Sequence, residues 1–115
     1  SPCLIAARLD GKARLGVLFG LQVTAGDVLT GGLHWYPENV EAGWLRRTDP
    51  LESDAPRTAV FLIREDDELS LILPANVGAR LGVGIAIDGT SVTHLQPREV
   101  LERGVDFVRY ACRAG

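Results

Sequence analysis

The stretch from Arg80 to Tyr110 reads RLGVGIAIDGTSVTHLQPREVLERGVDFVRY, and the fold prediction starts from it. Near its beginning, small residues separate four aliphatic residues at alternate positions: Leu81, Val83, Ile85 and Ile87. Because successive side chains of a strand point to opposite faces, this alternation predicts a strand with one apolar face and one nearly bare face. The apolar face would lie against a core, and another group could approach the bare face closely.

Turn and helix signals follow this predicted strand. Asp88-Gly89 predicts a hairpin with a two-residue type I′ turn, because both residues tolerate the positive φ that the turn requires. Pro97 stands at a helix-start position and Gly104 at a helix-end position, which predicts one or two helical turns over residues 98–103. A closing strand is predicted over residues 105–111.

Apolar runs bounded by turn residues predict strands elsewhere in the chain, over residues 4–9, 15–19, 22–24, 28–29, 58–63 and 69–73. Asp10-Gly11 joins the first two runs into a hairpin. The last two runs are almost continuously apolar, which predicts central strands covered on both faces. Residues 64–68 join them and carry four acidic side chains. We interpret this segment as a solvated turn, because metal ligands must converge from spaced positions.

These signals predict an all-β fold, either a β-sandwich or a partly open barrel of short antiparallel strands, with one short helical segment. A length of 115 residues, with 46% hydrophobic and 23% charged residues, is typical of one globular domain, here residues 1–115. The chain does not begin with methionine, so we expect this domain to be part of a longer protein.

Charge and hydropathy argue against two classes of partner. The chain has 12 Lys and Arg against 15 Asp and Glu, a net charge of −3, which argues against a nucleic-acid binder that works by bulk electrostatics. No apolar run reaches the roughly twenty residues that a membrane-spanning helix needs, and the first residues lack the charged, apolar and small-residue pattern of a secretory signal, so none is expected. We therefore expect a cytoplasmic protein that binds neither nucleic acid nor membrane.

The two cysteines, Cys3 and Cys112, lie near opposite ends of the chain. Neither has a partner at Cys-x-x-Cys spacing, so no zinc site is predicted within these residues. Two free thiols are expected in a cytoplasmic protein. A disulfide between them, or a metal-binding segment that begins at Cys112, stays an alternative.

Between residues 31 and 56 the apolar periodicity fails, which predicts a long loop with at most short strands near residues 33–36 and 43–47. A loop of this length usually carries function or order of its own. It holds the candidate peptide- or anion-binding residues Trp35, Trp44, Arg46 and Arg47. Aromatic rings beside guanidinium groups suit such recognition, through stacking and bidentate hydrogen bonds.

Plainer interpretations stand beside these. The two tryptophans could pin the loop to the sheet as satellite core residues. The two arginines could be surface charges paired with Asp49 or Glu52, and an exposed pair of this kind contributes only about 0–1 kcal/mol. Ser91 and His94 form a further candidate polar pair for binding, with a turn hydroxyl and a solvated imidazole as the alternative.

Motifs for catalysis are missing from the sequence. It contains no Gly-x-Ser-x-Gly elbow, no phosphate-binding loop and no His-Glu-x-x-His zinc motif. We predict no catalytic residue, no cofactor and no metal ligand. A small enzyme with its site in the 31–56 loop stays an alternative.

The last third of the chain resembles a forkhead-associated domain. Its small-residue strand, its Asp88-Gly89 turn and the segment LERGVDF at residues 101–107 are similar to the closing strands of that family. The resemblance implies a β-sandwich whose loops bind a phosphothreonine peptide. No arginine follows Gly31-Gly32, and the spacing of Ser91 and His94 falls after the turn instead of before it. The usual phosphothreonine-reading residues are therefore lacking.

The segment GIAIDGTSV at residues 84–92, followed by the predicted helix, also resembles a PDZ domain. That resemblance implies binding of a C-terminal peptide as an added strand. The sequence as a whole predicts a non-catalytic protein-interaction or accessory module with a protein or peptide partner. Alternatives are a PDZ-like peptide-binding domain, a structural domain that orders a neighbouring and possibly zinc-binding domain, and the small enzyme.

Overall fold

The chain is described by a computed structural model over residues 2–9, 11–36, 40–46 and 58–114. These residues form nine strands: β1 Cys3–Leu9, β2 Lys12–Thr24, β3 Val28–Trp35, β4 Val40–Leu45, β5 Thr58–Glu65, β6 Glu68–Pro74, β7 Ile85–Asp88, β8 Val92–Arg103 and β9 Phe107–Ala114. The prediction of an all-β fold is confirmed. Within the described ranges, no helix is long and apolar enough to cross a membrane.

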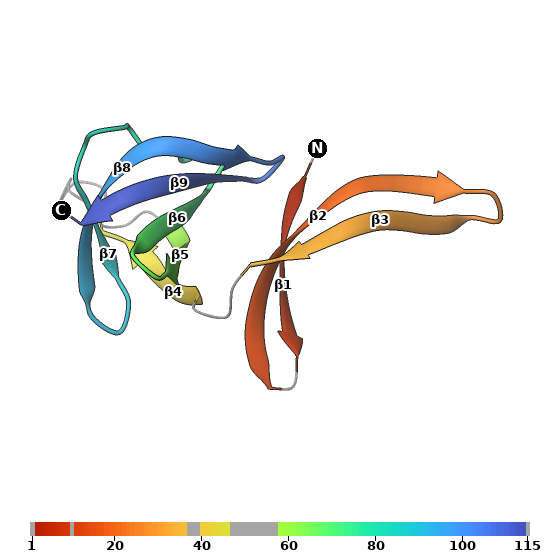
Figure 1. The fold of residues 1–115 in the computed structure, drawn as a ribbon, viewed down its shortest axis with the longest axis horizontal. Helices are drawn as coiled ribbons and strands as arrows, with labels where there is room; N and C mark the ends of the chain where they lie inside the picture. The colour runs from red at the N-terminus through yellow and green to blue at the C-terminus, as the bar shows by residue number, and fades with distance from the viewer. Residues whose placement is uncertain (1, 10, 37–39, 47–57, 115) are drawn as a thin grey trace.

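Six strands close into a barrel in the order β4-β5-β6-β9-β8-β7, with every neighbouring pair antiparallel (Figure 1). The closing contact is short, since β4 pairs with β7 only at Trp44–Asp88 and Leu45–Ile87. A Cβ atom at Gly43 would lie 2.9 Å from the Asp88 carbonyl oxygen. Glycine at this position therefore lets β7 come close enough to close the barrel, where an open barrel or a sandwich was expected.

The barrel interior is filled by aliphatic side chains and one tyrosine: Val60, Leu62, Leu71, Leu73, Ile87, Leu95, Val108 and Tyr110. These residues come from five of the six barrel strands and are buried. Burial of this apolar surface is the main favourable term in folding. The barrel therefore has a core of its own.

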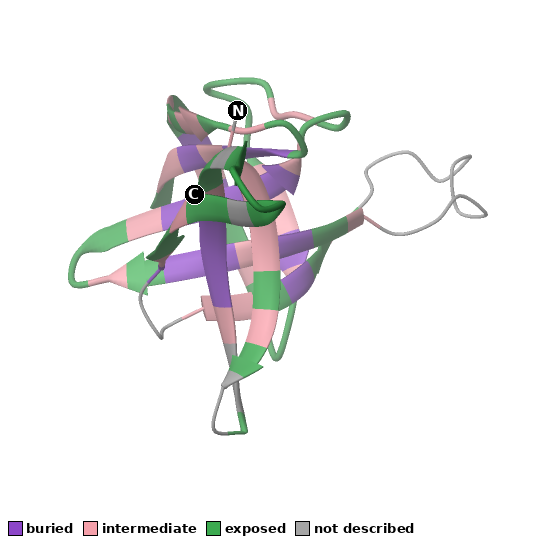
Figure 2. Cartoon of the chain, turned by 90° about the vertical axis from the view of Figure 1, so that its right-hand side faces the viewer, coloured by how far each residue is buried: buried purple, intermediate pink, exposed green. Residues whose placement is uncertain are grey.

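The other three strands form a separate antiparallel sheet, β1-β2-β3, that packs against the outside of the barrel (Figure 1). A second buried cluster joins the two parts: Leu15, Val17, Tyr36, Ile63, Ile72 and Phe107. The Val105 N–H also donates to the Pro2 carbonyl oxygen at 2.7 Å, and the Leu4 N–H donates to Asp106 Oδ1 at 3.0 Å. Burial is concentrated where the two parts meet and inside the barrel (Figure 2).

The predicted helix at residues 98–103 is wrong, because these residues lie within β8. Pro97 is buried, and the pairing of β8 with β9 is irregular between Pro97 and Glu99. Proline cannot donate a ladder hydrogen bond, so a bulge accommodates it within a strand. Gly104 follows in the turn, where its N–H donates to the Phe107 carbonyl oxygen at 2.9 Å. Pairing with β9, the next strand along the chain, has overridden the local helix signals.

The predicted strand over Leu81 to Ile87 is also largely wrong, because β7 begins only at Ile85. Gly82 has φ +82°, which interrupts an extended chain, and Leu81 and Val83 are about half exposed. The hairpin after β7 is confirmed, but residues 89–91 form its loop. Neither Asp88 nor Gly89 has positive φ, so the type I′ turn is wrong.

The two other hairpins predicted from local signals are also confirmed. The strands β1 and β2 pair around Gly11, and β5 and β6 pair around the acidic turn. The extended pair at 22–24 and 28–29 belongs to the longer β2–β3 hairpin. A long loop was predicted over residues 31–56, but β3 extends to residue 35 and β4 spans residues 40–45. Much of the predicted loop is therefore strand. Residues 47–57 lie outside the described ranges.

Candidate protein-binding face

One outer face of the barrel is built from β4, β7 and β8. Ile87 points into the core, so its neighbours Ala86 and Asp88 point outward. Cross-strand partners share a face, which places Trp44 and Val92 beside Asp88, and His94 beside Ala86. Arg46 joins them, because its N–H donates to the Ala86 carbonyl oxygen at 2.8 Å. We call these six residues the Trp44 face: Trp44, Arg46, Ala86, Asp88, Val92 and His94.

The Trp44 face brings together three of the residues that the sequence selected. Trp44 and Arg46 come from β4 and its end, and His94 comes from β8, so the face joins segments about fifty residues apart. Ser91 lies next to this face, in the β7–β8 loop, where its carbonyl oxygen accepts the Gly89 N–H at 3.1 Å. Among the described residues, no hydrogen bond links the side chains of Ser91 and His94.

Trp35 lies elsewhere, on β3. A Cβ atom at Gly16 would be 2.8 Å from Trp35 Cε3, so the indole covers this glycine. The Arg14 guanidinium lies 5.7 Å from the indole centroid and donates to the Tyr36 carbonyl oxygen at 3.1 Å. Trp35 is thus packed within the three-stranded sheet and is separate from the Trp44 face. Arg47 falls outside the described residues, as do Asp49 and Glu52.

Arg46 is paired with Asp88 through two contacts. Its Nη2 lies 2.6 Å from Asp88 Oδ1, and its Nε lies 3.3 Å from Oδ2. Hydrogen bonding to Asp88, followed by the attraction of its charge, raises the pKa of the Arg46 guanidinium. The sequence did not identify this partner, which lies 42 residues away. An anionic ligand would have to compete with Asp88 for Arg46.

A hollow of about 370 Å³ opens beside Trp44. Its walls are mainly apolar, with a polar end at the β7–β8 loop: Ala42, Gly43, Trp44, Ala59, Val60, Phe61, Asp88, Gly89 and Thr90. At the polar end, Glu41 Oε1 accepts the Thr90 hydroxyl at 3.2 Å and the Thr90 N–H at 3.4 Å. Trp44, which lines the hollow, remains 44% exposed. This hollow can take an apolar side chain.

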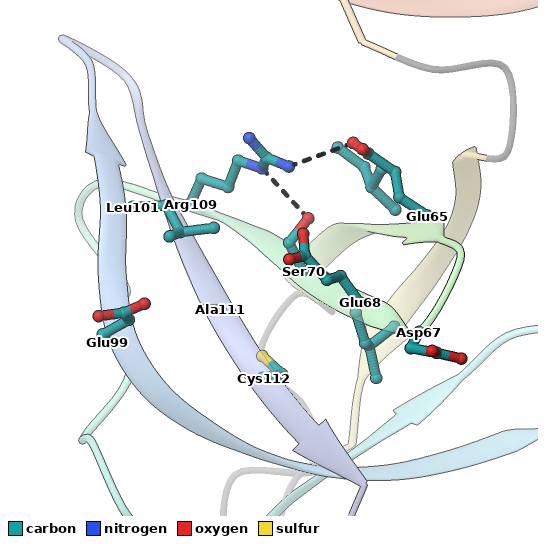
Figure 3. Close-up of a pocket in the computed structure, with 11 residues that line it drawn as sticks. Glu65, Asp67, Glu68, Ser70, Glu99, Leu101, Arg109, Ala111 and Cys112 are labelled. Carbon is teal, nitrogen blue, oxygen red and sulfur yellow. Dashed lines mark hydrogen bonds and ion pairs between the residues drawn. The ribbon is translucent and has the colours of Figure 1, made fainter.

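A second hollow, of about 210 Å³, is formed by other barrel strands, and Arg109 is among the residues that line it (Figure 3). The Arg109 Nε donates to Ser70 Oγ at 3.1 Å, and Arg109 Nη2 lies 3.6 Å from Glu65 Oε1. The guanidinium also lies 5.0 Å from the Tyr36 ring centroid. Arg109 is therefore engaged with two barrel side chains and with the Tyr36 ring at the joint between sheet and barrel. No local sequence signal identified this group, because its members come from four separate strands or their ends.

Two further groups have shifted pKa values: Tyr36, where the sheet meets the barrel, and Cys112, on β9 against the barrel core. Burial, and then the hydrogen bond to Glu102, raise the pKa of the Tyr36 hydroxyl. Burial raises the pKa of the Cys112 thiol to about 11. The thiolate is the nucleophilic form of cysteine, so Cys112 is protonated and unreactive near neutral pH. Cys3 and Cys112 are both free thiols.

Within the described ranges, no group of three or more His, Cys, Asp or Glu is arranged to hold a metal ion. Comparisons of the chain with protein-family models, with curated proteins and with solved structures found no match. Among the described residues, the Trp44 face and its hollow combine a half-exposed indole with mainly apolar walls and a polar end.

Proposed function

We propose that this chain is a non-catalytic protein-interaction module that binds a peptide segment of a partner protein on the Trp44 face. The observation that carries the proposal is a half-exposed indole at the rim of an apolar hollow. Tryptophan is enriched among the residues that dominate binding energies, especially beside pockets that a partner can fill. Ligand sites also combine apolar walls with a few polar groups that set orientation.

The chemistry of the face favours an uncharged anchor in the partner. An apolar side chain would enter the hollow beside Trp44, and polar groups next to it would contact Asp88 and Thr90 at its polar end. Because Arg46 is already paired with Asp88, a phosphate group gains less from this arginine than from a free one. This supports a module that binds peptides without the phosphothreonine-reading residues. The resemblances to forkhead-associated and PDZ domains stay predictions.

Selection from a library of random linear peptides, with the whole chain as bait, tests this proposal. For the selected peptides, we expect Trp44→Ala to weaken binding by about 30-fold in calorimetric titrations, the size typical of a dominant interface residue. Val105→Ala is the matched control, because Val105 is 65% exposed on a different turn. The proposal is wrong if no peptide binds, or if Trp44→Ala binds as tightly as the control.

A further inference from the structure

The outer half of the β2–β3 hairpin extends away from the barrel (Figure 1). We call residues 19–33 the arm. Except for Gly32, every arm residue with a described side chain is exposed. The large apolar residues of the arm whose side chains are described are between 46% and 71% exposed: Phe19, Val23, Val28 and Leu33. The arm thus presents apolar side chains that are largely exposed to solvent.

The arm also carries almost no charge. Charged residues make up 23% of the chain, but Asp27 at the hairpin turn is the only one in the arm. An uncharged apolar surface is poorly suited to nucleic acid, whose binding depends on neutralised phosphates. It is well suited to another uncharged apolar surface, because burying both costs no charge desolvation.

Within the described residues both edges of the arm lack a neighbouring strand, because β1 pairs only with residues 12–18 of β2. The β2 edge is interrupted by the irregularity between Phe19 and Gln22, so the β3 edge is the more regular template for strand pairing. The sheet order β1-β2-β3 leaves the outer edge of β3 without a neighbour among the described residues, whereas closure removes all edges from the barrel. Proteins commonly protect such edges with charged residues or proline. Over Val28–Trp35, β3 contains neither Asp, Glu, Lys, Arg nor Pro. Its free N–H and C=O groups therefore form an unprotected template for another strand.

The surface area is large enough for a stable dimer. The chain exposes 7652 Å², whereas a compact monomer of its 12.4 kDa mass exposes about 6,100 Å². The Cα radius of gyration is 15.7 Å, against about 13 Å for a compact chain of this length. The excess surface is about 1,500 Å², and a standard interface buries about 800 Å² on each partner. The exposed arm contributes to this excess, which is larger than the area that one partner loses in a standard interface.

We infer that two copies of this chain associate through their arms, with β3 of one copy pairing antiparallel with β3 of the other. A pair centred on Gly31 would place Asp27 of one copy opposite Trp35 of its partner. The two Asp27 carboxylates would then lie about 27 Å apart, since each residue of a strand advances the chain by about 3.4 Å. This distance exceeds the Debye length of about 8 Å at physiological salt, so their repulsion is screened.

In this arrangement, each copy contributes the outer edge of its β3 to the pairing. The uncharged β3 strand is therefore complementary to a second copy of itself. A parallel pair would instead bring the two Asp27 side chains together, which disfavours it. The arm shares no residue with the Trp44 face, so this inference does not depend on the proposed function. Two copies joined in this way would present two Trp44 faces.

Sedimentation equilibrium on the whole chain, up to about 100 µM, tests the inference. We expect a reversible dimer, and we expect the double variant Val28→Lys with Leu33→Lys to raise its dissociation constant by at least about 100-fold. Val77→Lys with Leu81→Lys is the matched control, because it adds the same charge at half-exposed sites outside the arm. The control should change the constant by less than about threefold, and circular dichroism should show that both variants are folded.

Amide hydrogen exchange of the unmodified chain provides a second test that needs no variant. We expect protection of β3 amides to rise with protein concentration, because pairing of the two edges buries their N–H groups. A chain that stays monomeric at about 100 µM overturns the inference, and so does a control pair that dissociates the dimer as strongly as the arm pair. A monomer that captures an extended peptide of another protein along β3 would also show that a second copy is the wrong occupant.

Discussion

The closed barrel and the three-stranded sheet are both built from antiparallel hairpins, but they differ in what covers their strands. Closure hides the barrel edges, and the interior holds a core of its own. Among the described residues, the sheet is covered where Leu4, Leu15 and Val17 pack on the barrel, and its outer half reaches into solvent. This difference shows that forming a hairpin does not by itself make its residues important for stability. Burial of their side chains decides that.

The largest expected effect comes from the barrel interior. Leu71→Ala should lower the free energy of unfolding by about 3 kcal/mol, because it leaves a cavity among fully buried side chains. Val23→Ala in the arm should change it by less than about 0.5 kcal/mol, since Val23 is exposed. Urea unfolding at a concentration where the chain is monomeric measures both. Equal losses would break the contrast between barrel and arm.

The contact that closes the barrel should be next in size. Gly43→Ala would place a Cβ atom 2.9 Å from the Asp88 carbonyl oxygen and the same distance from Ile87 Cγ2. Displacement of β7 should lower the free energy of unfolding by about 2 kcal/mol. Gly84→Ala is the control, because its Cβ would meet its nearest atom, the Leu95 carbonyl oxygen, at 4.0 Å. If both variants unfold at the same urea concentration, closure does not depend on Gly43.

The joint between sheet and barrel should contribute less. Tyr36→Phe removes the hydroxyl that donates to Glu102 and leaves the packing of the ring intact. We expect a loss of about 1.5 kcal/mol, which is typical of a hydrogen bond to a charged group. Faster amide exchange in the inner halves of β1 and β2, with unchanged exchange in β6, would locate the effect at the joint. Uniformly faster exchange would show that sheet and barrel unfold as one unit.

Alkaline pH should lower the free energy of unfolding, because Cys112 loses its proton. Burial raises the pKa of this thiol to about 11, so the folded chain holds its proton more tightly than the unfolded chain does. The stabilising contribution is complete below the unfolded-state pKa and is lost as the pH rises to about 11. Urea midpoints measured from pH 8 to 11 should fall, and Cys112→Ala should flatten the fall. Tyr36, whose pKa is also raised, adds to the loss at higher pH.

The smallest expected effect concerns the exposed pair of Arg46 and Asp88. Arg46→Ala should leave the urea midpoint unchanged within experimental error, because both side chains are solvated and the pair is screened by salt. Its effect on binding of a selected peptide should also be smaller than that of Trp44→Ala. A clear loss of stability would show that this pair helps to hold β4 beside β7.

Local patterns predicted much of the barrel. The hairpin of β5 and β6 was recognisable because two apolar runs flank a short acidic turn, and its bounds agree within two residues. The helix predicted from Pro97 and Gly104 is wrong. These two residues are typical of helix ends, but the residues between them pair with β9 and form a strand. The glycines at 31 and 32 hid the continuity of β3. The nearly uncharged run across residues 15–35 was a signal that could have revealed the arm.

The sequence by itself determined that the chain is all-β and which local runs form hairpins, because strand alternation and turn residues act over short distances. It also selected Trp44, Arg46 and His94 as candidate binding residues. Only the tertiary structure decided that these three share a face, that Asp88 holds Arg46, and that β7 closes the barrel against β4. These outcomes depend on pairing between strands about forty to fifty residues apart, where no local pattern specifies the register.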